Sequence, residues 1–408
     1  MQLPSSSAAD RVVDGVPLPS DVAIDTGSAA VDSVLQHWTG AWIGTWSGLK
    51  HILLVESVER DGHASVVYAI GDNPYVGIHR QWNRLDATAT NDRVTITGAG
   101  FTAVYERTGP NSAKATYTRG TLTARAAMNK VDFTTLIIPG APVDWSGGKS
   151  QFLLTDLVED GQQVRLEAVI FKPAGAGPFP LALINHGSTG DGKDPALFTE
   201  TWFNDSLADF LNERGWLVAF LQRRGRGKSE GLYDEGFWPD RKKGYTWEVK
   251  DSLAGADRAM QDIGAGLAVL QCRPDVIPSR VLIGGQSRGG VLSIAFAGEH
   301  PQHIVGVINF VGGWLSDYGL SAQIVNQALF ERGGRFNWPT LWLYGRHDPF
   351  YSIPHSRENF AAFQRVGGRG SFREYDVPGG DGHALIGYPH LWSSAVEDYL
   401  KSLPMNEK

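Results

Sequence analysis

The segment Val281-Leu282-Ile283-Gly284-Gly285-Gln286-Ser287-Arg288-Gly289-Gly290-Val291 decides the fold that we expect for this chain. An apolar, β-branched run leads into a G-x-S-x-G sequence, and small and apolar residues continue after it to Ala297. This order predicts a strand, a sharp turn that carries Ser287, and a helix, with glycines where a Cβ atom would clash. Such a turn lifts a serine hydroxyl clear of the sheet, so Ser287 is the candidate nucleophile.

A second G-x-S-x-G match, Gly227-Lys228-Ser229-Glu230-Gly231, lies upstream. The residues that follow it run into Phe237-Trp238-Pro239, which does not begin a helix cleanly. Because the motif needs a strand before it and a helix after it, we choose Ser287 over Ser229. The Gly-Lys-Ser sequences at 148–150 and 227–229 lack the earlier glycine of a phosphate-binding loop, so no cofactor is predicted.

Strand-like and helical segments alternate on both sides of this turn, which predicts an α/β fold with a doubly wound, mostly parallel sheet over residues 146–404. An extended hairpin, Phe152 to Val158 and Val164 to Phe171, precedes the alternating units. The further strands are expected at 181–184, 217–221, 281–283, 304–310, 340–344 and 372–377. Helices are expected at about 196–214, 251–271, 288–300, 318–331, 355–366 and 390–402.

The N-terminal part has a different pattern. From Trp38 to about Asp132, short β-like runs such as Ile52 to Val58 and Ala64 to Ile70 are separated by turn signals, and no helical stretch interrupts them. Many short, evenly spaced strands predict a closed barrel or a sandwich. We therefore expect a loosely ordered segment at 1–35, a barrel-like domain at 36–145 and the α/β domain at 146–404, with Pro/Gly-rich punctuation near 139–148.

Reactive groups in an open α/β sheet gather at the carboxyl ends of its strands. Asp348 follows the expected strand at 340–344, and His383 follows the last expected strand. Ser287, Asp348 and His383 thus occur in the chain order nucleophile, acid, base that belongs to this kind of turn. We assign His383 as the base and Asp348 as the acid that orients it, with Asp317 and Asp381 as the competing acids.

A nucleophilic serine also needs two amide donors for the oxyanion. We expect these to be the backbone amides of Arg288 and of Ser188, in the His186-Gly187-Ser188 loop, which His186 is expected to pin structurally. The Arg288 side chain either binds a substrate carboxylate or pairs with an acid on the rim, and we favour the pairing. Among the aromatic residues that follow strand ends, we expect Trp238, Trp314 and Phe350 to bind substrate.

Five motifs in a fixed order give residues 150–404 a resemblance to a known superfamily. They are His186-Gly187-Ser188-Thr189-Gly190, Arg224-Gly225-Arg226-Gly227-Lys228-Ser229, Gly285-Gln286-Ser287-Arg288-Gly289, Gly345-Arg346-His347-Asp348 and Gly382-His383. This region resembles the α/β-hydrolase superfamily, most of all its dienelactone-hydrolase-like and prolyl-oligopeptidase-like members. Dienelactone hydrolases usually carry a nucleophilic cysteine, so the serine here implies a serine esterase instead. The tryptophan-rich segment 38–48 looks like the entry to a lipocalin-like barrel.

The leading functional hypothesis is a serine hydrolase that cleaves small-molecule carboxylic esters through an acyl-enzyme. A peptidase or amidase of the prolyl-oligopeptidase-like type is the enzymatic alternative. A non-catalytic binding protein with a hydrolase fold is the alternative from another class. Near the segments expected to form the cleft, the sequence shows no acidic pair that would bind a free amino terminus, which disfavours the peptidase.

Length and composition bound these hypotheses. The chain has 408 residues, enough for two domains, and a net charge of −7, which argues against nucleic acid or an anionic membrane as a partner. The one cysteine, Cys272, excludes an intrachain disulfide and a cysteine-based zinc site, and we expect it to be buried in a helix. No metal is predicted. The first residues carry no export signal pattern, which fits a cytoplasmic protein or an exported one whose signal has been removed.

Overall fold

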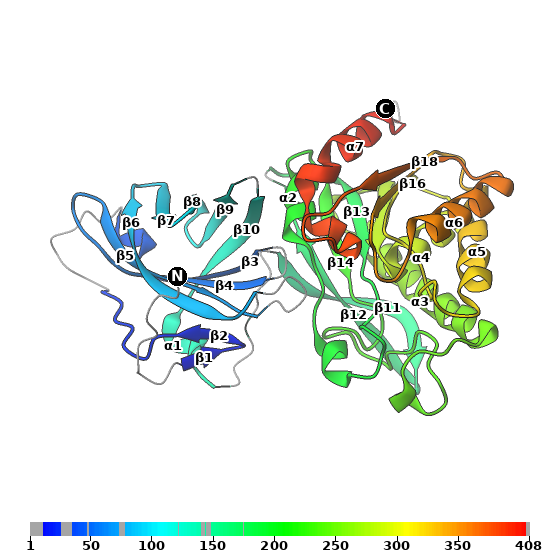
Figure 1. The fold of residues 1–408 in the computed structure, drawn as a ribbon, viewed down its shortest axis with the longest axis horizontal. Helices are drawn as coiled ribbons and strands as arrows, with labels where there is room; N and C mark the ends of the chain where they lie inside the picture. Colours follow the sequence, from blue (N-terminus) through cyan, green and yellow to red (C-terminus); the bar gives the residue numbers. More distant parts are fainter. Residues whose placement is uncertain are drawn as a thin grey trace. The chain divides into compact units, whose positions relative to one another are not determined.

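The computed structural model describes residues 11–25, 35–46, 49–72, 78–120, 122–139, 143, 148–173 and 175–404. The chain divides into two compact units, Met1–Gly147 and Gly148–Lys408 (Figure 1). Most of the expected boundary segment at 139–148 lies outside the described residues. The same is true of residues 47–48 in the tryptophan-rich segment and of much of the expected loose segment at 1–35.

One part of that N-terminal segment is ordered, which corrects the expectation of a loose lead-in. Strands β1 (Arg11–Val13) and β2 (Val16–Leu18) form an antiparallel hairpin. Asp14 and Gly15 between them both have positive φ angles, 44° and 89°, as a tight hairpin turn requires. Strand β2 packs against β4, β5 and β6, and Val16 and Leu18 are buried. The Asp-Gly pair was the local signal for this hairpin.

The first unit contains a closed, eight-stranded antiparallel barrel, as the sequence predicted. Its strands follow one another in chain order, and β10 pairs with both β9 and β3 to close it. The strands are β3 (Gly40–Trp46), β4 (Leu49–Val58), β5 (His63–Ile70), β6 (Gln81–Ala89), β7 (Arg93–Gly98), β8 (Phe101–Gly109), β9 (Ser112–Arg119) and β10 (Leu122–Val131). Alternate residues of β3, Trp42 and Trp46, belong to its interior core. Helix α1 (Phe133–Leu136) follows the barrel.

A buried histidine lies in the barrel interior. The Nδ1 atom of His51 is 2.8 Å from the carbonyl oxygen of Ala69, so it carries the proton and donates it. Nε2 therefore accepts from the Tyr105 hydroxyl, also at 2.8 Å. Burial lowers the pKa of His51 to about 3, because the charged imidazolium loses its hydration there.

The second unit is built on an eight-stranded mixed sheet with the order β11-β12-β14-β13-β15-β16-β17-β18. Strand β12 runs antiparallel to β11 and β14, and the strands from β14 to β18 run parallel. The strands are β11 (Lys149–Glu159), β12 (Gln162–Phe171), β13 (Phe179–Asn185), β14 (Leu217–Leu221), β15 (Val276–Gln286), β16 (Ile304–Phe310), β17 (Thr340–Gly345) and β18 (Gly370–Tyr375). The doubly wound, mostly parallel sheet is confirmed.

The helices of this unit form two packed groups. Helix α2 (Asp205–Asn212) contacts α7 (Pro389–Ser402). Helices α3 (Val249–Gln271), α4 (Arg288–Glu299), α5 (Ala322–Arg332) and α6 (Ile353–Arg365) contact one another in succession. None of the helices in the described ranges has the length and apolar character needed to cross a membrane.

The structure differs from two of the expected helices and from the expected burial of Cys272. The helix expected at 196–214 is instead a short 3-10 turn, Pro195–Thr199, followed by α2. The helix is interrupted because Asn204 has an extended backbone. Its Oδ1 atom caps the start of α2 by accepting from the Leu207 amide at 2.8 Å. Helix α5 begins at Ala322 rather than at 318. Cys272 is exposed, not buried, because α3 ends at Gln271 and Cys272 is its C-cap.

Candidate active site

Ser287 occupies a strained turn between β15 and α4. Its φ and ψ angles are 56° and −123°, in a region that non-glycine residues rarely adopt. The Ser287 amide donates to the Phe310 carbonyl of the neighbouring strand β16 at 3.0 Å. A Cβ atom on Gly289 would lie 2.1 Å from the carbonyl oxygen of Asn185, so only glycine allows the turn to pack directly against the end of β13.

Asp348 and His383 form a hydrogen bond at the ends of β17 and β18. The Nδ1 atom of His383 lies 2.9 Å from Oδ2 of Asp348, and because a carboxylate can only accept, Nδ1–H is the donor. The other oxygen, Oδ1, accepts from the amides of Phe350 and Tyr351 at 2.8 and 3.1 Å. The carboxylate is thus fixed from both sides, and Nε2 of His383 is the ring nitrogen that can accept a proton.

Tyr351 links all three predicted catalytic residues. Its amide donates to Asp348, its ring lies 5.7 Å from that of His383 between centroids, and its hydroxyl oxygen is 3.5 Å from Oγ of Ser287. Gln286, beside Ser287, donates from Nε2 to the His383 carbonyl at 3.0 Å. The structure therefore brings Ser287, Asp348 and His383 to one place.

The Tyr351 hydroxyl also has a partner in the loop after β16. It donates to the Gly313 carbonyl at 2.8 Å, and the Gly313 amide donates to the Ser287 carbonyl at 3.2 Å. Burial raises the pKa of Tyr351, so this hydroxyl stays neutral. Tyr351 is not among the catalytic or substrate-binding residues that the sequence predicts. Its position three residues after Asp348 was the available signal.

The competing acids make other contacts. Oδ2 of Asp317 accepts from the Ser352 amide at 2.9 Å, next to the start of α6. Oδ1 of Asp381 accepts from the His383 amide at 3.0 Å and so caps the short helix Gly382–Gly387. Both carboxylates hold backbone in place, whereas Asp348 contacts the imidazole ring itself.

The hydroxyl of Ser229 is occupied by hydrogen bonds to backbone groups. Its Oγ atom donates to the Gln222 carbonyl and accepts from the Glu167 amide, both at 2.7 Å, and the residue is buried. These bonds tie the loop after β14 to β12. No helix follows Ser229 in this part of the described chain.

The loop after β13 passes over Ser287. A Cβ atom on Gly187 would lie 3.0 Å from the Ser287 Cβ. His186 is buried, and its Nδ1–H donates to the Gly187 carbonyl at 2.7 Å while Nε2 accepts from the Arg223 amide at 3.2 Å. In a trans peptide the N–H points opposite to the C=O, so holding the Gly187 carbonyl also orients the Ser188 N–H.

His186 remains neutral in this setting. Its burial, together with the positive charges of Arg223 and Arg226, holds its pKa well below the usual range. A neutral ring is what the two bonds require, because Nε2 must accept. These contacts agree with the structural role expected for His186.

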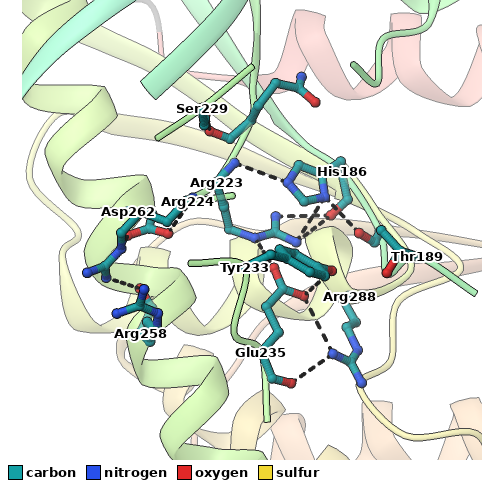
Figure 2. A network of polar contacts seen from close by, with 12 residues as sticks. His186, Thr189, Arg223, Arg224, Ser229, Tyr233, Glu235, Arg258, Asp262 and Arg288 are labelled. Carbon is teal, nitrogen blue, oxygen red and sulfur yellow. Dashed lines mark hydrogen bonds and ion pairs between the residues drawn. The ribbon is translucent and has the colours of Figure 1, made fainter. Parts of the chain in front are cut away.

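The side chain of Arg288 is buried and paired. Nη1 donates to the Glu235 carbonyl at 2.9 Å and lies 3.5 Å from Oε2 of the same residue (Figure 2). Nε donates to the Trp314 carbonyl at 3.2 Å. The guanidinium lies between the rings of Tyr245 and Trp314, 3.7 and 4.3 Å from their centroids. The acid is thus buried Glu235 and not a rim residue, which corrects the expectation. Glu235 lies in an irregular loop, where no sequence period could reveal it.

The three predicted substrate-binding residues differ in their surroundings. Phe350 is 38% exposed, and its ring lies edge-on to His383 at 4.8 Å between centroids, beside the candidate base. Trp314 is buried, and its ring packs against the guanidinium of Arg288. Trp238 is half-buried, and the contacts described for it do not include Ser287, Asp348 or His383.

The strand order of the second unit, with one antiparallel strand near its start and a serine turn after its fifth strand, β15, defines an α/β-hydrolase fold.

No protein-family model and no curated protein matches the sequence. An esterase of Pyrococcus furiosus is similar in structure, with 16% identity and a TM-score of 0.44 over 63% of this chain and 90% of that one. An esterase of Butyrivibrio proteoclasticus with bound ferulic acid has 17% identity and a TM-score of 0.42, over 62% and 98%. A prolyl endopeptidase has 15% identity and a TM-score of 0.39, over 87% and 50%.

Proposed function

We propose that this chain is a serine hydrolase that cleaves carboxylic esters through an acyl-enzyme. Ser287 is the nucleophile, His383 the general base and Asp348 the acid that orients it. The observation that carries the proposal is the 2.9 Å bond between Nδ1 of His383 and Asp348, made beside a serine on a strained turn. That bond fixes the tautomer in which Nε2 is free to take a proton.

The reaction proceeds in two balanced steps. Oγ of Ser287 attacks the ester carbonyl while Nε2 of His383 accepts its proton, and the same proton then passes to the alcohol as the C–O bond breaks. Water next attacks the acyl-enzyme, losing a proton to His383, and the acid leaves as Ser287 regains its hydrogen. The amides of Ser188 and Arg288 donate to the oxyanion in both steps.

The charges around the site disfavour a substrate that has a free amino terminus. A free amino terminus would need a carboxylate that is available to receive it. The buried carboxylate of Glu235 is already paired with Arg223, at 2.5 Å from its Nε, and with Arg288. An uncharged ester requires no such partner.

A substrate panel tests the proposal. We expect wild-type protein to hydrolyse p-nitrophenyl esters, assayed with acyl chains from acetate to laurate, and to be much slower on aminoacyl anilides. Ser287→Ala should lower kcat by about 10⁴-fold or more, because members of a triad act as a unit, while the circular dichroism spectrum is retained. A preference for anilides would contradict the ester assignment. Retention of activity by Ser287→Ala would contradict the nucleophile, and inactivity of the wild type on both classes would favour a binding protein.

A further inference from the structure

The two proposed oxyanion donors lie on separate elements. The Ser188 amide belongs to the loop after β13, and the Arg288 amide is at the first residue of α4. A pair of donors stabilises an oxyanion only if both point at the same oxygen, and small errors in their placement are costly. Some feature of the fold must therefore hold this loop and this helix terminus so that both amides point at the same oxygen.

Arg223 holds the loop that carries Ser188 in place through hydrogen bonds. Its Nη1 and Nη2 atoms both donate to the His186 carbonyl, at 3.0 and 3.1 Å. Its own amide donates to the His186 ring, which in turn holds the Gly187 carbonyl. The position of the Arg223 guanidinium therefore sets the position of the peptide that precedes the Ser188 donor.

Glu235 connects Arg223 to the turn between β15 and α4 that carries Ser287 and Arg288, which we call the elbow. Its Oε1 atom accepts from Nε of Arg223 at 2.5 Å, and its Oε2 atom accepts from the Tyr233 hydroxyl at 3.2 Å. Oε2 also lies 3.5 Å from Nη1 of Arg288, and the Glu235 carbonyl accepts from that same nitrogen at 2.9 Å. Figure 2 shows Glu235 with Arg223 on one side and Arg288 on the other.

We propose that Glu235 is a positioning residue. By pairing with Arg223 and Arg288 at the same time, it keeps the Ser188 and Arg288 amides pointed at the same oxygen. This rests on the proposed hydrolase function. The charges give the reason for a carboxylate: Arg223, Arg288 and Glu235 are 1%, 3% and 2% exposed, so water screens them poorly. Without the negative charge, the two buried guanidinium groups repel each other and separate the loop from the elbow.

The chain offers a matched control in the next residue. Arg224 pairs with Asp262 of α3 through Nε and Oδ1 at 2.5 Å, and its amide donates to Oδ2 at 2.9 Å (Figure 2). Both side chains are nearly as buried as those of Arg223 and Glu235. The bonds described for Asp262 do not reach the Ser188 loop or the elbow. Asp262→Asn therefore removes a comparable buried charge and leaves the placement of the Ser188 and Arg288 amides unchanged.

The test compares Glu235→Gln with Asp262→Asn in the full chain. We expect Glu235→Gln to lower kcat on the best p-nitrophenyl ester by about 10- to 100-fold, with KM within about threefold and an unchanged midpoint in the pH profile of kcat. The inhibition constant of a trifluoromethyl ketone, whose adduct with serine places an oxyanion between the two amides, should rise by a similar factor. Asp262→Asn should keep kcat within about threefold while losing thermal stability.

The outcomes separate this inference from the proposed function. If the wild type hydrolyses esters and Ser287→Ala does not, but Glu235→Gln keeps both kcat and ketone affinity, only the positioning role of Glu235 is overturned. If Ser287→Ala keeps its activity, the proposed function itself has failed.

A second variant covers the case in which Glu235→Gln does not fold. Arg288→Met retains the residue 288 amide and an apolar stem between Tyr245 and Trp314, but it removes the guanidinium from Glu235. We expect kcat and ketone affinity to fall about 10-fold or more. A rise in KM confined to esters that carry a carboxylate, with kcat unchanged, would contradict the proposal, because Arg288 would then bind substrate rather than position its amide.

Discussion

Three aspartates compete for one role, and at the scale of single residues their hydrogen bonds separate them. Asp348 accepts from the His383 ring, Asp381 accepts from the His383 amide, and Asp317 accepts from the Ser352 amide. Spacing along the sequence favoured Asp348, because it follows the strand before the histidine loop. Spacing alone could not tell which atom of His383 each carboxylate meets.

Conversion of each aspartate to asparagine tests this distinction. Asp348→Asn should lower kcat by about 10⁴-fold, because the amide can stabilise the wrong imidazole tautomer and cannot balance the imidazolium charge. Asp317→Asn and Asp381→Asn should keep most activity and lose a modest amount of stability, since an asparagine oxygen still accepts from a backbone amide. Initial rates on one p-nitrophenyl ester check this. A crippled Asp317→Asn beside an active Asp348→Asn would move the acid to the preceding strand.

The elbow is the element in which local sequence and tertiary packing agree most closely. The run from Val281 to Val291 predicts a strand, a turn and a helix, and the structure has β15, the positive φ of Ser287 and α4 in those places. The glycines matter because of what they approach. Gly289 faces Asn185 and His186 at the end of β13, and this contact is visible only in the folded structure.

We therefore expect alanine substitutions at two helical glycines to have opposite effects on activity and stability. A Cβ on Gly289 would lie 2.1 and 2.6 Å from the carbonyl oxygens of Asn185 and His186, so Gly289→Ala should shift the Ser188 loop and lower kcat by about 10-fold or more. In α3, a Cβ on Gly264 would meet only Phe296, at 3.5 Å. Gly264→Ala should retain activity and gain about 0.5–1 kcal/mol of stability from helix propensity. Unfolding curves and ester hydrolysis of both variants check this, and equal activities would contradict the account of the elbow.

At the scale of the whole molecule, the two sequence patterns correspond to two architectures. Period-2 runs separated by turns became a closed barrel, and alternating strand and helix patterns became the mixed sheet. The strand order could not be predicted in the same way. Placing β14 between β12 and β13 depends on how the chain crosses over, which no local period encodes. The loop that holds Glu235 has no period at all, and its role depends on arginines brought to it from two other segments.

The barrel also predicts how the molecule responds to acid. The pKa of His51 is about 3 in the folded chain, below the ~6.5 of an unfolded histidine. Below pH ~6.5 the unfolded state therefore binds a proton that the folded state does not, so stability falls as the pH drops, by up to about 1.4 kcal/mol per pH unit. The pKa of His186 is lowered as well and acts in the same direction.

Calorimetric unfolding of the full chain between pH 7 and pH 5 measures this effect. Wild-type protein should lose stability over that range, and His51→Gln should show a weaker dependence, because one titrating group is gone. Burial raises the pKa of Asp262 to about 6, which opposes the loss over the same range, so the comparison of the two slopes is the decisive readout. A slope that His51→Gln leaves unchanged would show that His51 does not supply the proton linkage.

The most direct measurement of the central claim is the site of covalent labelling by a fluorophosphonate, located by peptide mass spectrometry. The phosphorus forms a bond to the attacking serine oxygen and fluoride leaves, so only an activated serine reacts quickly. We predict a single adduct on the peptide that contains Ser287, its loss in Ser287→Ala, and its retention in Ser229→Ala. An unlabelled wild type, or an adduct that persists in Ser287→Ala, would contradict the account.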